Sequence, residues 1–232
     1  MNSQRRHSLG LALFMAAALP LASHANSLVN GGFESQPNFG AGISGDSGYS
    51  ALTGAQIPGW TIEAGHAATV HNTVIYPFIS GSYSINMDGE GYLGRNANLY
   101  QDFASSSGVG YALDYDWQTW FTDTTPKLNV SITDTVTLAL LYQGNFSVGV
   151  DGVVHHVTAS FTGTGHALRL RVSELPESGY NDNAFIVDNF AVNAVPEAAT
   201  WVLMAGGLGA LGLARWRLNR PWGNAEQVPR GH

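Results

Sequence analysis

The sequence predicts an all-β domain, folded as a β-sandwich, between an export signal and a membrane-spanning segment. Apolar and polar residues alternate along most of the central chain, as they do in Tyr111–Gln118. Turn signals recur roughly every ten residues, and no central segment has the period of an amphipathic helix. Alternation with period two is typical of strands that bury one face, so we expect many short strands in two packed layers.

The N-terminal residues 1–25 have the three parts of a secretory signal peptide. Arg5 and Arg6 give a basic start, Leu9–Leu21 form an apolar stretch, and Ser23-His24-Ala25 is a small-residue cleavage site. We predict that this segment is removed on export and takes no part in the fold.

The remaining central segment, residues 26–194, suits a single domain of 169 residues. It contains fifteen acidic and four basic side chains, which give a formal charge of −11, and the chain has no cysteine. This charge argues against nucleic acid and anionic membrane surfaces as partners, and it is compatible with neutral glycans and divalent cations.

The first half of the domain is expected to contain five strands. They are Leu28–Glu34, Trp60–Ile62, Tyr83–Asp88, Ala97–Phe103 and Tyr111–Gln118. Trp60 is large enough to anchor the core, and a structural role there is favoured over ligand stacking. On the fifth strand the aromatic residues share one face, while Asp114, Asp116 and Gln118 share the other.

The second half is expected to continue in the same way. Thr135–Tyr142 is compatible with a short helix or with a fully buried strand, because its apolar run suits both. Asn145–Val150 leads into the hairpin signal Asp151-Gly152, with Val153–Phe161 as the returning strand. Leu168–Val172 alternates leucine and valine with two arginines, and Ala184–Val192 is the last strand.

The C-terminal segment 195–217 is predicted to hold a transmembrane helix. Residues 198–214 form an uncharged apolar run of roughly 25 Å as a helix, the lower limit for crossing a bilayer. Arg215 and Arg217 follow directly and should keep residues 218–232 as a cytoplasmic tail, with the acidic domain outside.

The order of Pro196-Glu197, a short apolar helix and a basic cluster resembles the PEP-CTERM sorting signal. This chain departs from that pattern in having Ala198 at the second proline and about fifteen residues after the cluster. The resemblance implies an exosortase-type membrane enzyme as processing partner. It also implies a stay in the inner membrane before processing, then a place at the cell surface or outside the cell. An uncleaved C-terminal anchor is the alternative.

A second resemblance covers most of residues 26–194. It rests on five short motifs in a fixed order, namely Asn30-Gly31-Gly32-Phe33-Glu34, Ile57-Pro58-Gly59-Trp60, Ser84-Ile85-Asn86-Met87-Asp88-Gly89, Leu99-Tyr100-Gln101-Asp102-Phe103 and Val187-Asp188-Asn189-Phe190. This order is similar to that of galactose-binding-like jelly rolls, which include several carbohydrate-binding modules. The resemblance implies a jelly-roll β-sandwich with a structural calcium held by Glu34 and Asp188, and with Asp46 and backbone carbonyls completing the shell. Alternatively, Glu34 and Asp188 are separately solvated at strand ends.

Sugar binding requires a flat aromatic ring beside hydrogen-bonding groups. Trp120, Asp116 and Gln118 form the best local cluster, with Trp120 as the platform because Trp117 continues the apolar stripe of its strand. Core packing or a loop cover is the alternative role for Trp120. Asp114 and Asp116 lie two residues apart on one face, so a carboxylate pair of a polysaccharide hydrolase also stays open.

These observations lead to one expectation and two alternatives. We expect an exported, non-enzymatic protein of the cell surface or of an exopolysaccharide matrix such as a biofilm. A calcium-stabilised carbohydrate-binding module is the first alternative, and a hydrolase is the second.

Overall fold

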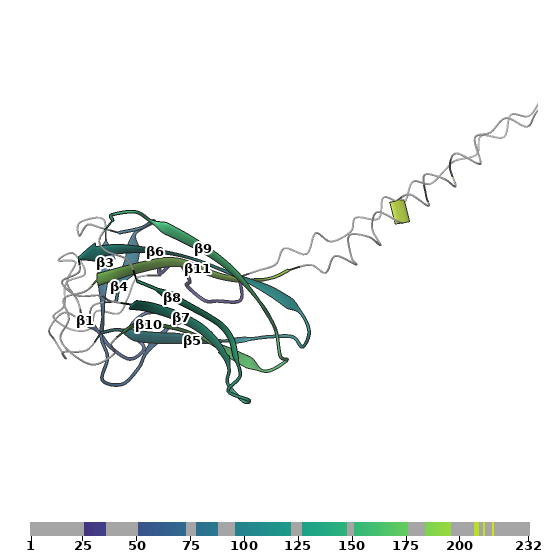
Figure 1. Ribbon diagram of the computed structural model, residues 1–232, viewed down its shortest axis with the longest axis horizontal. Coiled ribbons are helices and arrows are strands. Elements are labelled where there is room, and N and C mark those ends of the chain that lie inside the picture. The colour runs from purple at the N-terminus through teal and green to yellow at the C-terminus, as the bar shows by residue number, and fades with distance from the viewer. Residues whose placement is uncertain are drawn as a thin grey trace, which may run out of the picture.

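The computed structural model describes residues 26–35, 51–72, 78–87, 96–121, 127–147, 151–175 and 184–195, together with residues 207, 208, 211 and 215. Within these ranges the chain forms eleven strands (Figure 1). They are β1 Ala51–Leu52, β2 Thr61–Ile62, β3 Ala68–Asn72, β4 Tyr83–Asn86, β5 Asn98–Ala104, β6 Gly110–Phe121, β7 Lys127–Asp134, β8 Leu140–Phe146, β9 His155–Thr162, β10 Ala167–Leu175 and β11 Ala184–Ala194.

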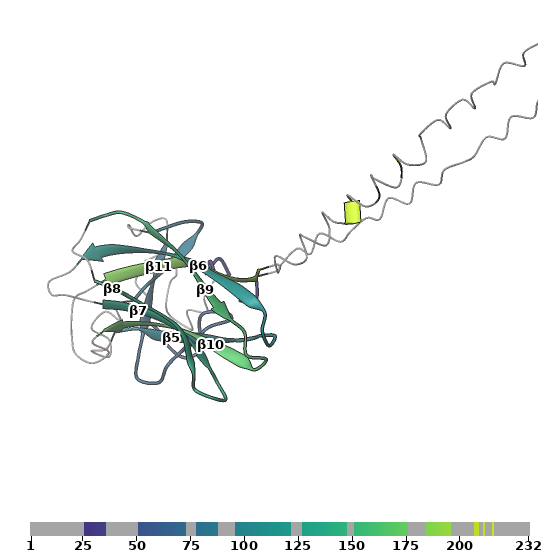
Figure 2. The same cartoon turned by 45° about the vertical axis from the view of Figure 1, so that its right-hand side comes forward.

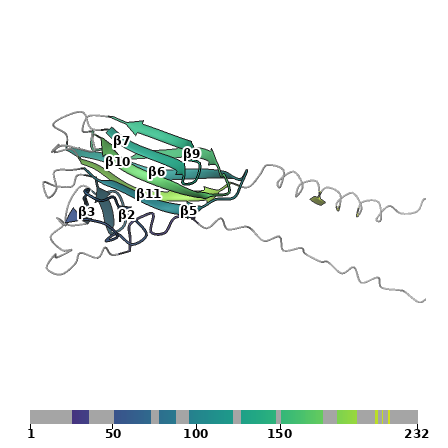
Figure 3. The ribbon, with the colours of Figure 1, turned by 90° about the horizontal axis from the view of Figure 1, so that it is seen from below.

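The strands form two antiparallel sheets stacked as layers (Figures 1 and 2), and the strands of the two sheets overlap when seen from below (Figure 3). Six strands lie in the order β1-β3-β4-β11-β6-β9, and five in the order β2-β5-β10-β7-β8. Of the connections between described strands, those from β3 to β4 and from β7 to β8 stay within one sheet, and the others cross to the opposite sheet. Repeated crossing of this kind is typical of a jelly roll. The expected all-β jelly-roll sandwich is confirmed.

Period-two alternation places the core between the two sheets. The inward residues of β6, including Leu113 and Tyr115, are buried. Trp60 is also buried, with its ring centroid 5.2 Å from that of Phe33 and 5.5 Å from that of Phe190. Its indole Nε1 donates a hydrogen bond to the carbonyl of Asn30 at 3.1 Å. The predicted structural role of Trp60 is therefore confirmed.

The segment predicted as a strand at Leu28–Glu34 is instead a series of bends and turns. Asn30 and Phe33 have φ values of 53° and 56°, a left-handed conformation that interrupts a strand ladder. Two backbone hydrogen bonds still tie the segment to β11, from Ser27 N to Val192 O at 2.8 Å and from Phe190 N to Gly31 O at 2.9 Å. The first described residues thus close the sandwich without forming a strand.

Both interpretations of Thr135–Tyr142 were wrong, because the segment begins as a turn and β8 starts only at Leu140. The carboxylate of Asp134 accepts hydrogen bonds from the backbone N–H groups of Val136 and Thr137, each at 2.8 Å. A short polar side chain of this kind offers the backbone an alternative to helix or ladder bonds. The turn then ends at Leu138, which has a φ of 61° and is 76% exposed.

The prediction that Asp151-Gly152 joins two paired strands of a hairpin was also wrong. Gly152 has a positive φ of 65°, as expected of a turn. However, β8 pairs with β7 and β9 pairs with β6, so this connection joins different sheets. The tight turn at Asp134 already gives β8 a neighbouring antiparallel partner, and the turn at Gly152 therefore passes the chain across the sandwich.

The predicted signal peptide, residues 1–25, lies outside the described residues, and so does most of the predicted transmembrane run 198–214. Pro196, Glu197 and Arg217 lie outside them as well, while Arg215 is described as helical and exposed. No helix within the described residues is long and apolar enough to cross a membrane.

Substitution of Gly31 should weaken the closure of the sandwich. A Cβ atom at this position would overlap the carbonyl oxygen of Phe190, which is backbone and cannot move aside easily. We expect Gly31→Ala to lower the free energy of unfolding by about 2 kcal/mol or more, and the melting temperature by roughly 5 °C or more. Gly110→Ala is the matched control, because a Cβ there has no atom within 4 Å. Equal thermal denaturation of the two variants would contradict this account.

Candidate functional site

The outer face of the five-stranded sheet gathers charged and hydrogen-bonding side chains from several strands. Strand β10 lies between β5 and β7, with Arg169 opposite Asp102 and Arg171 opposite Tyr100 on the β5 side. Because Leu168, Leu170 and Val172 point into the core, the two arginines point outward. We call the set Glu63, Asn98, Tyr100, Asp102, Arg169 and Arg171 the arginine face.

Arg169 is held by two neighbours on β5. Its Nε donates to Asp102 Oδ1 at 2.7 Å and its Nη2 donates to Asp102 Oδ2 at 2.8 Å, which is a bidentate ion pair. The guanidinium carbon lies 3.8 Å from the centroid of the Tyr100 ring, a cation–π contact. The hydrogen bonds to Asp102 raise the pKa of Arg169 further above its ordinary value. The side chain is therefore charged and fixed in one orientation.

Arg171 forms a second ion pair beside the first. Its Nη1 donates to Glu63 Oε2 at 2.9 Å, and Asn98 Nδ2 donates to the same oxygen at 2.7 Å. Arg171 Nη1 also donates a hydrogen bond to the side-chain Oδ1 of Asn98 at 3.3 Å, so the three side chains hold one another. The side chains of Arg171 and Glu63 are 30% and 39% exposed, and those of Arg169 and Asp102 are 32% and 41% exposed. Both pairs remain open to a ligand.

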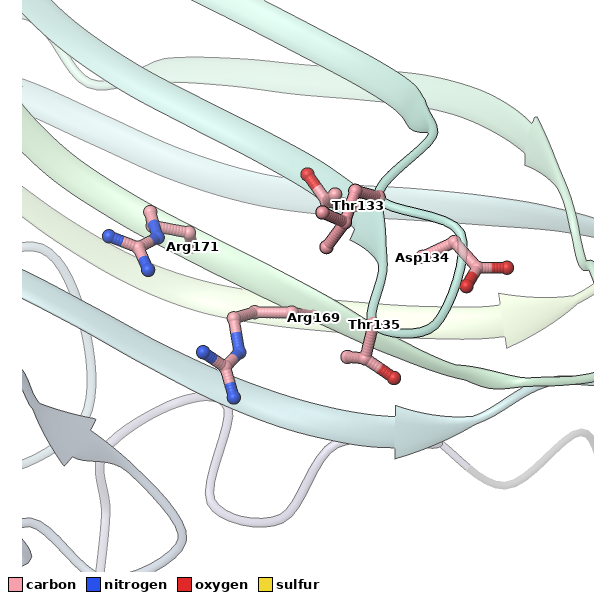
Figure 4. Close-up of a pocket in the computed structure, with 6 residues that line it drawn as sticks. Thr133, Asp134, Thr135, Arg169 and Arg171 are labelled. Atoms are coloured by element: carbon pink, nitrogen blue, oxygen red, sulfur yellow. The ribbon is translucent and has the colours of Figure 1, made fainter.

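A groove of ≈ 230 Å³ runs beside the two arginines (Figure 4). Its lining residues are Thr133, Asp134, Thr135, Leu138, Arg169 and Arg171. The turn after β7 forms one wall, with Leu138 as its exposed apolar residue. Asp134 fixes this wall, and hydrogen bonds from the Thr164 side chain and the backbone of Thr137 hold its pKa well below the ordinary range.

The chemistry of this face suits a ligand rich in hydroxyl groups. Its two arginines and two carboxylates balance in charge, although the whole domain is strongly acidic. Paired guanidinium and carboxylate groups present donors and acceptors in a fixed plane, and hydroxyl groups can bond to both. Because the side chains of these ion pairs are already ordered, binding a ligand costs less side-chain entropy.

The sugar-binding residues predicted from the sequence lie on the other sheet. Asp116, Gln118 and Trp120 all belong to β6, and the Trp120 side chain lies outside what the structure describes. Gln118 is only 4% exposed. Asp116 Oδ1 lies 2.7 Å from His156 Nδ1, and Asp116 Oδ2 accepts a hydrogen bond from Asn189 Nδ2 at 2.8 Å. These contacts engage Asp116 within its own sheet.

The predicted carboxylate pair is linked through a histidine. The His156 ring lies between Asp116 and Asp114, with His156 Nε2 3.8 Å from Asp114 Oδ1. Thr158 donates a hydrogen bond to the same Asp114 oxygen at 2.7 Å. The arrangement is a polar network across β6 and β9 whose members are bonded to one another.

The predicted calcium ligands Glu34 and Asp188 meet at one loop. Glu34 accepts hydrogen bonds from the backbone N–H of Ser82 at 3.0 and 2.9 Å, and Asp188 Oδ2 accepts one from the backbone N–H of Ser80 at 3.2 Å. Gly32 lies between them, since a Cβ there would be 3.8 Å from Glu34 Cγ and 4.0 Å from Asp188 Oδ1. Both carboxylates thus bond to the same loop, with Glu34 exposed and Asp188 buried.

Asp188 is a fully buried carboxyl group. All four hydrogen bonds that it accepts from described residues come from neutral groups, the backbone N–H of Ser80 and Asn189 and the hydroxyls of Ser80 and Ser84. Burial raises its pKa to about 7. A buried oxygen donor beside an exposed carboxylate suits a hard cation such as calcium. The described residues contain no cluster of three or more metal-binding side chains, and Asp46 lies outside them.

The arginine face was missed at the sequence level, although part of its signal is visible there. The alternation of Arg169 and Arg171 with apolar residues shows that both point away from the core. Their carboxylate partners, Asp102 and Glu63, are 67 and 108 residues away along the chain. Because antiparallel pairing over such separations has no local signature, sequence alone does not bring these groups together.

Comparison with known proteins shows similarity of fold at low sequence identity. No protein-family model matches this chain, and no curated protein matches it. The solved structure of TmCBM61 in complex with β-1,4-galactotriose matches with a TM-score of 0.43 and 14% identity, over 74% of this chain and 99% of that one. The CBM22-1 xylan-binding domain from Paenibacillus barcinonensis Xyn10C matches with a TM-score of 0.45 and 15% identity, over 63% of this chain and 91% of that one. An arabinose-bound MgGH51 α-L-arabinofuranosidase matches with a TM-score of 0.47 and 10% identity, over 74% of this chain and 26% of that one.

Proposed function

We propose that this domain binds a neutral polysaccharide at the arginine face and does not turn it over. The observation that carries the proposal is the pair of partly exposed, mutually neutralising ion pairs that border Tyr100 and the groove. Asp102 and Glu63 already accept hydrogen bonds from guanidinium groups. Carboxylates held in this way are suited to orienting hydroxyl groups.

The neutrality of the ligand follows from the charge of the site. An anionic polysaccharide would compete with Asp102 and Glu63 for the two arginines and would meet a domain of formal charge −11. A neutral chain can bond to both members of each pair without separating them. Leu138 at the wall of the groove gives an apolar contact for the carbon-rich face of a sugar ring.

The proposal includes a structural calcium at Glu34 and Asp188. The burial of Asp188, its neutral donors and the neighbouring Glu34 carboxylate support it. The cation would neutralise both carboxylates and join the N-terminal segment to β11 through the loop at Ser80–Ser82. This metal would be structural and distant from the arginine face, which lies on the other sheet.

The proposal also includes export and sorting. The signal peptide 1–25 and the segment 195–217 support a protein held in the inner membrane by 198–214 until an exosortase-type enzyme processes it near Pro196 and Glu197. Arg215 and Arg217 would hold the cytoplasmic end before processing. The domain would then act at the cell surface or in an extracellular polysaccharide matrix.

Glycan binding should depend on the bidentate guanidinium group of Arg171. We expect Arg171→Lys to weaken binding to neutral galactan or xylan by about tenfold or more, because lysine keeps the charge but loses the bidentate geometry. The measurement is isothermal titration with each polysaccharide, alongside a polyuronate for comparison. Asp116→Asn on the other sheet is the control and should bind as the wild type does. Loss of binding in Asp116→Asn alone would move the site to β6, and stronger binding to polyuronate would exclude a neutral ligand.

In the calcium-free domain, ionisation of Asp188 should make the folded state less stable as pH rises. This is the reverse of the usual effect of a carboxyl group. The pKa of Asp188 is raised to about 7 in the folded state, against about 4 in an unfolded chain. The folded state therefore binds the extra proton between these values, so the free energy of unfolding should fall as pH rises from about 4 to about 7, at up to about 1.4 kcal/mol per pH unit. Asp188→Asn should lack this slope.

Calcium should act at the upper end of the same pH range. At about pH 8 Asp188 is ionised at a cost in stability, so excess calcium should raise the melting temperature of the wild type by several degrees relative to chelator. Thermal denaturation of the wild type, Glu34→Gln and Asp188→Asn measures the effect, which both variants should lose. Melting temperatures that do not respond to calcium in the wild type would remove the metal from the proposal.

Processing can be tested on protein recovered from its native host. We expect the intact mass of the extracellular form to correspond to a chain that begins at Asn26 and lacks residues 198–232, because both end segments are removed on sorting. Recovery of only a membrane-bound species that retains His232 would indicate an uncleaved anchor instead.

A further inference from the structure

Two long strands end the two sheets on the same side of the sandwich. Strand β8 ends the five-stranded sheet, strand β9 ends the six-stranded sheet, and the two strands contact each other. The opposite side is formed by β1 and β2, which have two residues each. Very short edge strands offer little backbone to a partner, whereas strands of seven and eight residues offer much more. We call the pair β8 and β9 the open edge.

The open edge lacks two of the features that normally prevent strand pairing between molecules, charged residues and proline, although the register of β8 against β7 shifts between Leu140 and Tyr142. Leu140–Phe146 and His155–Thr162 contain no aspartate, glutamate, lysine, arginine or proline. Natural sheets block their edges with charges or proline for this purpose. The absence of charge here contrasts with the formal charge of −11 on residues 26–194. The two edge strands themselves therefore add no charge repulsion between copies, although Asp114 and Asp151 lie beside β9.

The core is incompletely covered along the open edge. Tyr142, Phe146 and Val157 pack against the core but are only partly buried, whereas residues on the central strands, such as Tyr115, are fully buried. Exposed apolar residues also lie at both ends of the edge. Leu140 begins β8 at one end, and Val153 and Val154 precede β9 at the other. A covering partner would remove all of these from water.

We propose that the open edge is the interface of a two-fold symmetric homodimer, in which β9 pairs with β9 and β8 with β8 of a second copy. A single added strand from another protein would extend one sheet and leave the other edge free. A two-fold axis perpendicular to both sheets extends both at once, because antiparallel pairing is self-complementary. It also places the Leu140 end of one copy against the Val153–Val154 end of the other. This inference is independent of glycan binding.

The absence of cysteine allows a direct test in the full chain. In a two-fold antiparallel pair one residue of β9 lies opposite itself, with Cα atoms about 4.5–5.5 Å apart, within the span of a disulfide. Single cysteines are placed in turn at residues 157–160 of the full chain in mild detergent, followed by gentle oxidation. We expect a disulfide-linked species of twice the 24.7 kDa chain mass, with a sharp maximum at one of the four positions. Ser107→Cys, on the exposed β5–β6 turn, is the control and should stay monomeric.

A charged substitution in β9 distinguishes specific strand pairing from cross-linking by random collision. Thr158→Lys puts two lysines into the interface, so it should reduce the cross-linked fraction of the best cysteine position other than 158 by about tenfold or more. Light scattering of the unmodified chain should show a dimer that dissociates on dilution. Equal cross-linking at all positions including Ser107, a monomer at every concentration, or open-ended aggregation would each overturn the proposal. Unchanged melting of Thr158→Lys would show that the loss of pairing is not a loss of folding.

Discussion

The structure depends on the placement of the last strand, β11, in the middle of the six-stranded sheet, between β4 and β6. Its Phe190 lies in the aromatic core with Trp60 and Tyr115, and its Asp188 holds the loop at Ser80. The N-terminal segment closes against the same strand through Ser27 and Gly31. Because most of these contacts join residues more than a hundred positions apart, the core is complete only when the C-terminal end of the domain has arrived. Folding dominated by such distant pairing is expected to be slow.

The two outer faces of the sandwich hold their charges in different ways. On the six-stranded sheet, Asp116 and Asp188 take hydrogen bonds from neutral or histidine side chains, and Asp188 is buried with a raised pKa. On the five-stranded sheet, Asp102 and Glu63 face guanidinium groups and remain partly exposed. The first arrangement leaves negative charge that a cation can balance, and the second is balanced already. This difference underlies the proposed separation of a structural calcium site from a surface for an uncharged ligand.

The sequence predicts which way side chains point much better than which strands are neighbours. Alternation correctly placed Tyr111, Tyr115 and Trp117 of β6 in the core, because a period of two is local information. The burial of Trp60 was predicted from the size of its side chain. Local pattern failed at Thr135–Tyr142, where the Asp134 side chain captures the backbone in a turn, and at Asp151-Gly152, where the turn joins different sheets. The resemblance to galactose-binding-like jelly rolls named Glu34 and Asp188, which bond to the same loop, as ligands of a calcium site that stays a prediction. The arginine face needed the register of β5 against β10, which no local pattern encodes.

The proposed dimer would connect the arginine face with the C-terminal sorting segment. A two-fold axis perpendicular to the sheets leaves both arginine faces on the same side of the pair, so one polysaccharide chain could engage two sites and gain avidity. The same axis reverses the strands, so the two copies of Val195, bonded to Gly110 at the start of β6, leave from opposite ends of the pair. Two segments anchored in one membrane would have to reach it from opposite directions. If the domain is anchored and released as proposed, pairing would be favoured after release, and proteolytic sorting would also control assembly.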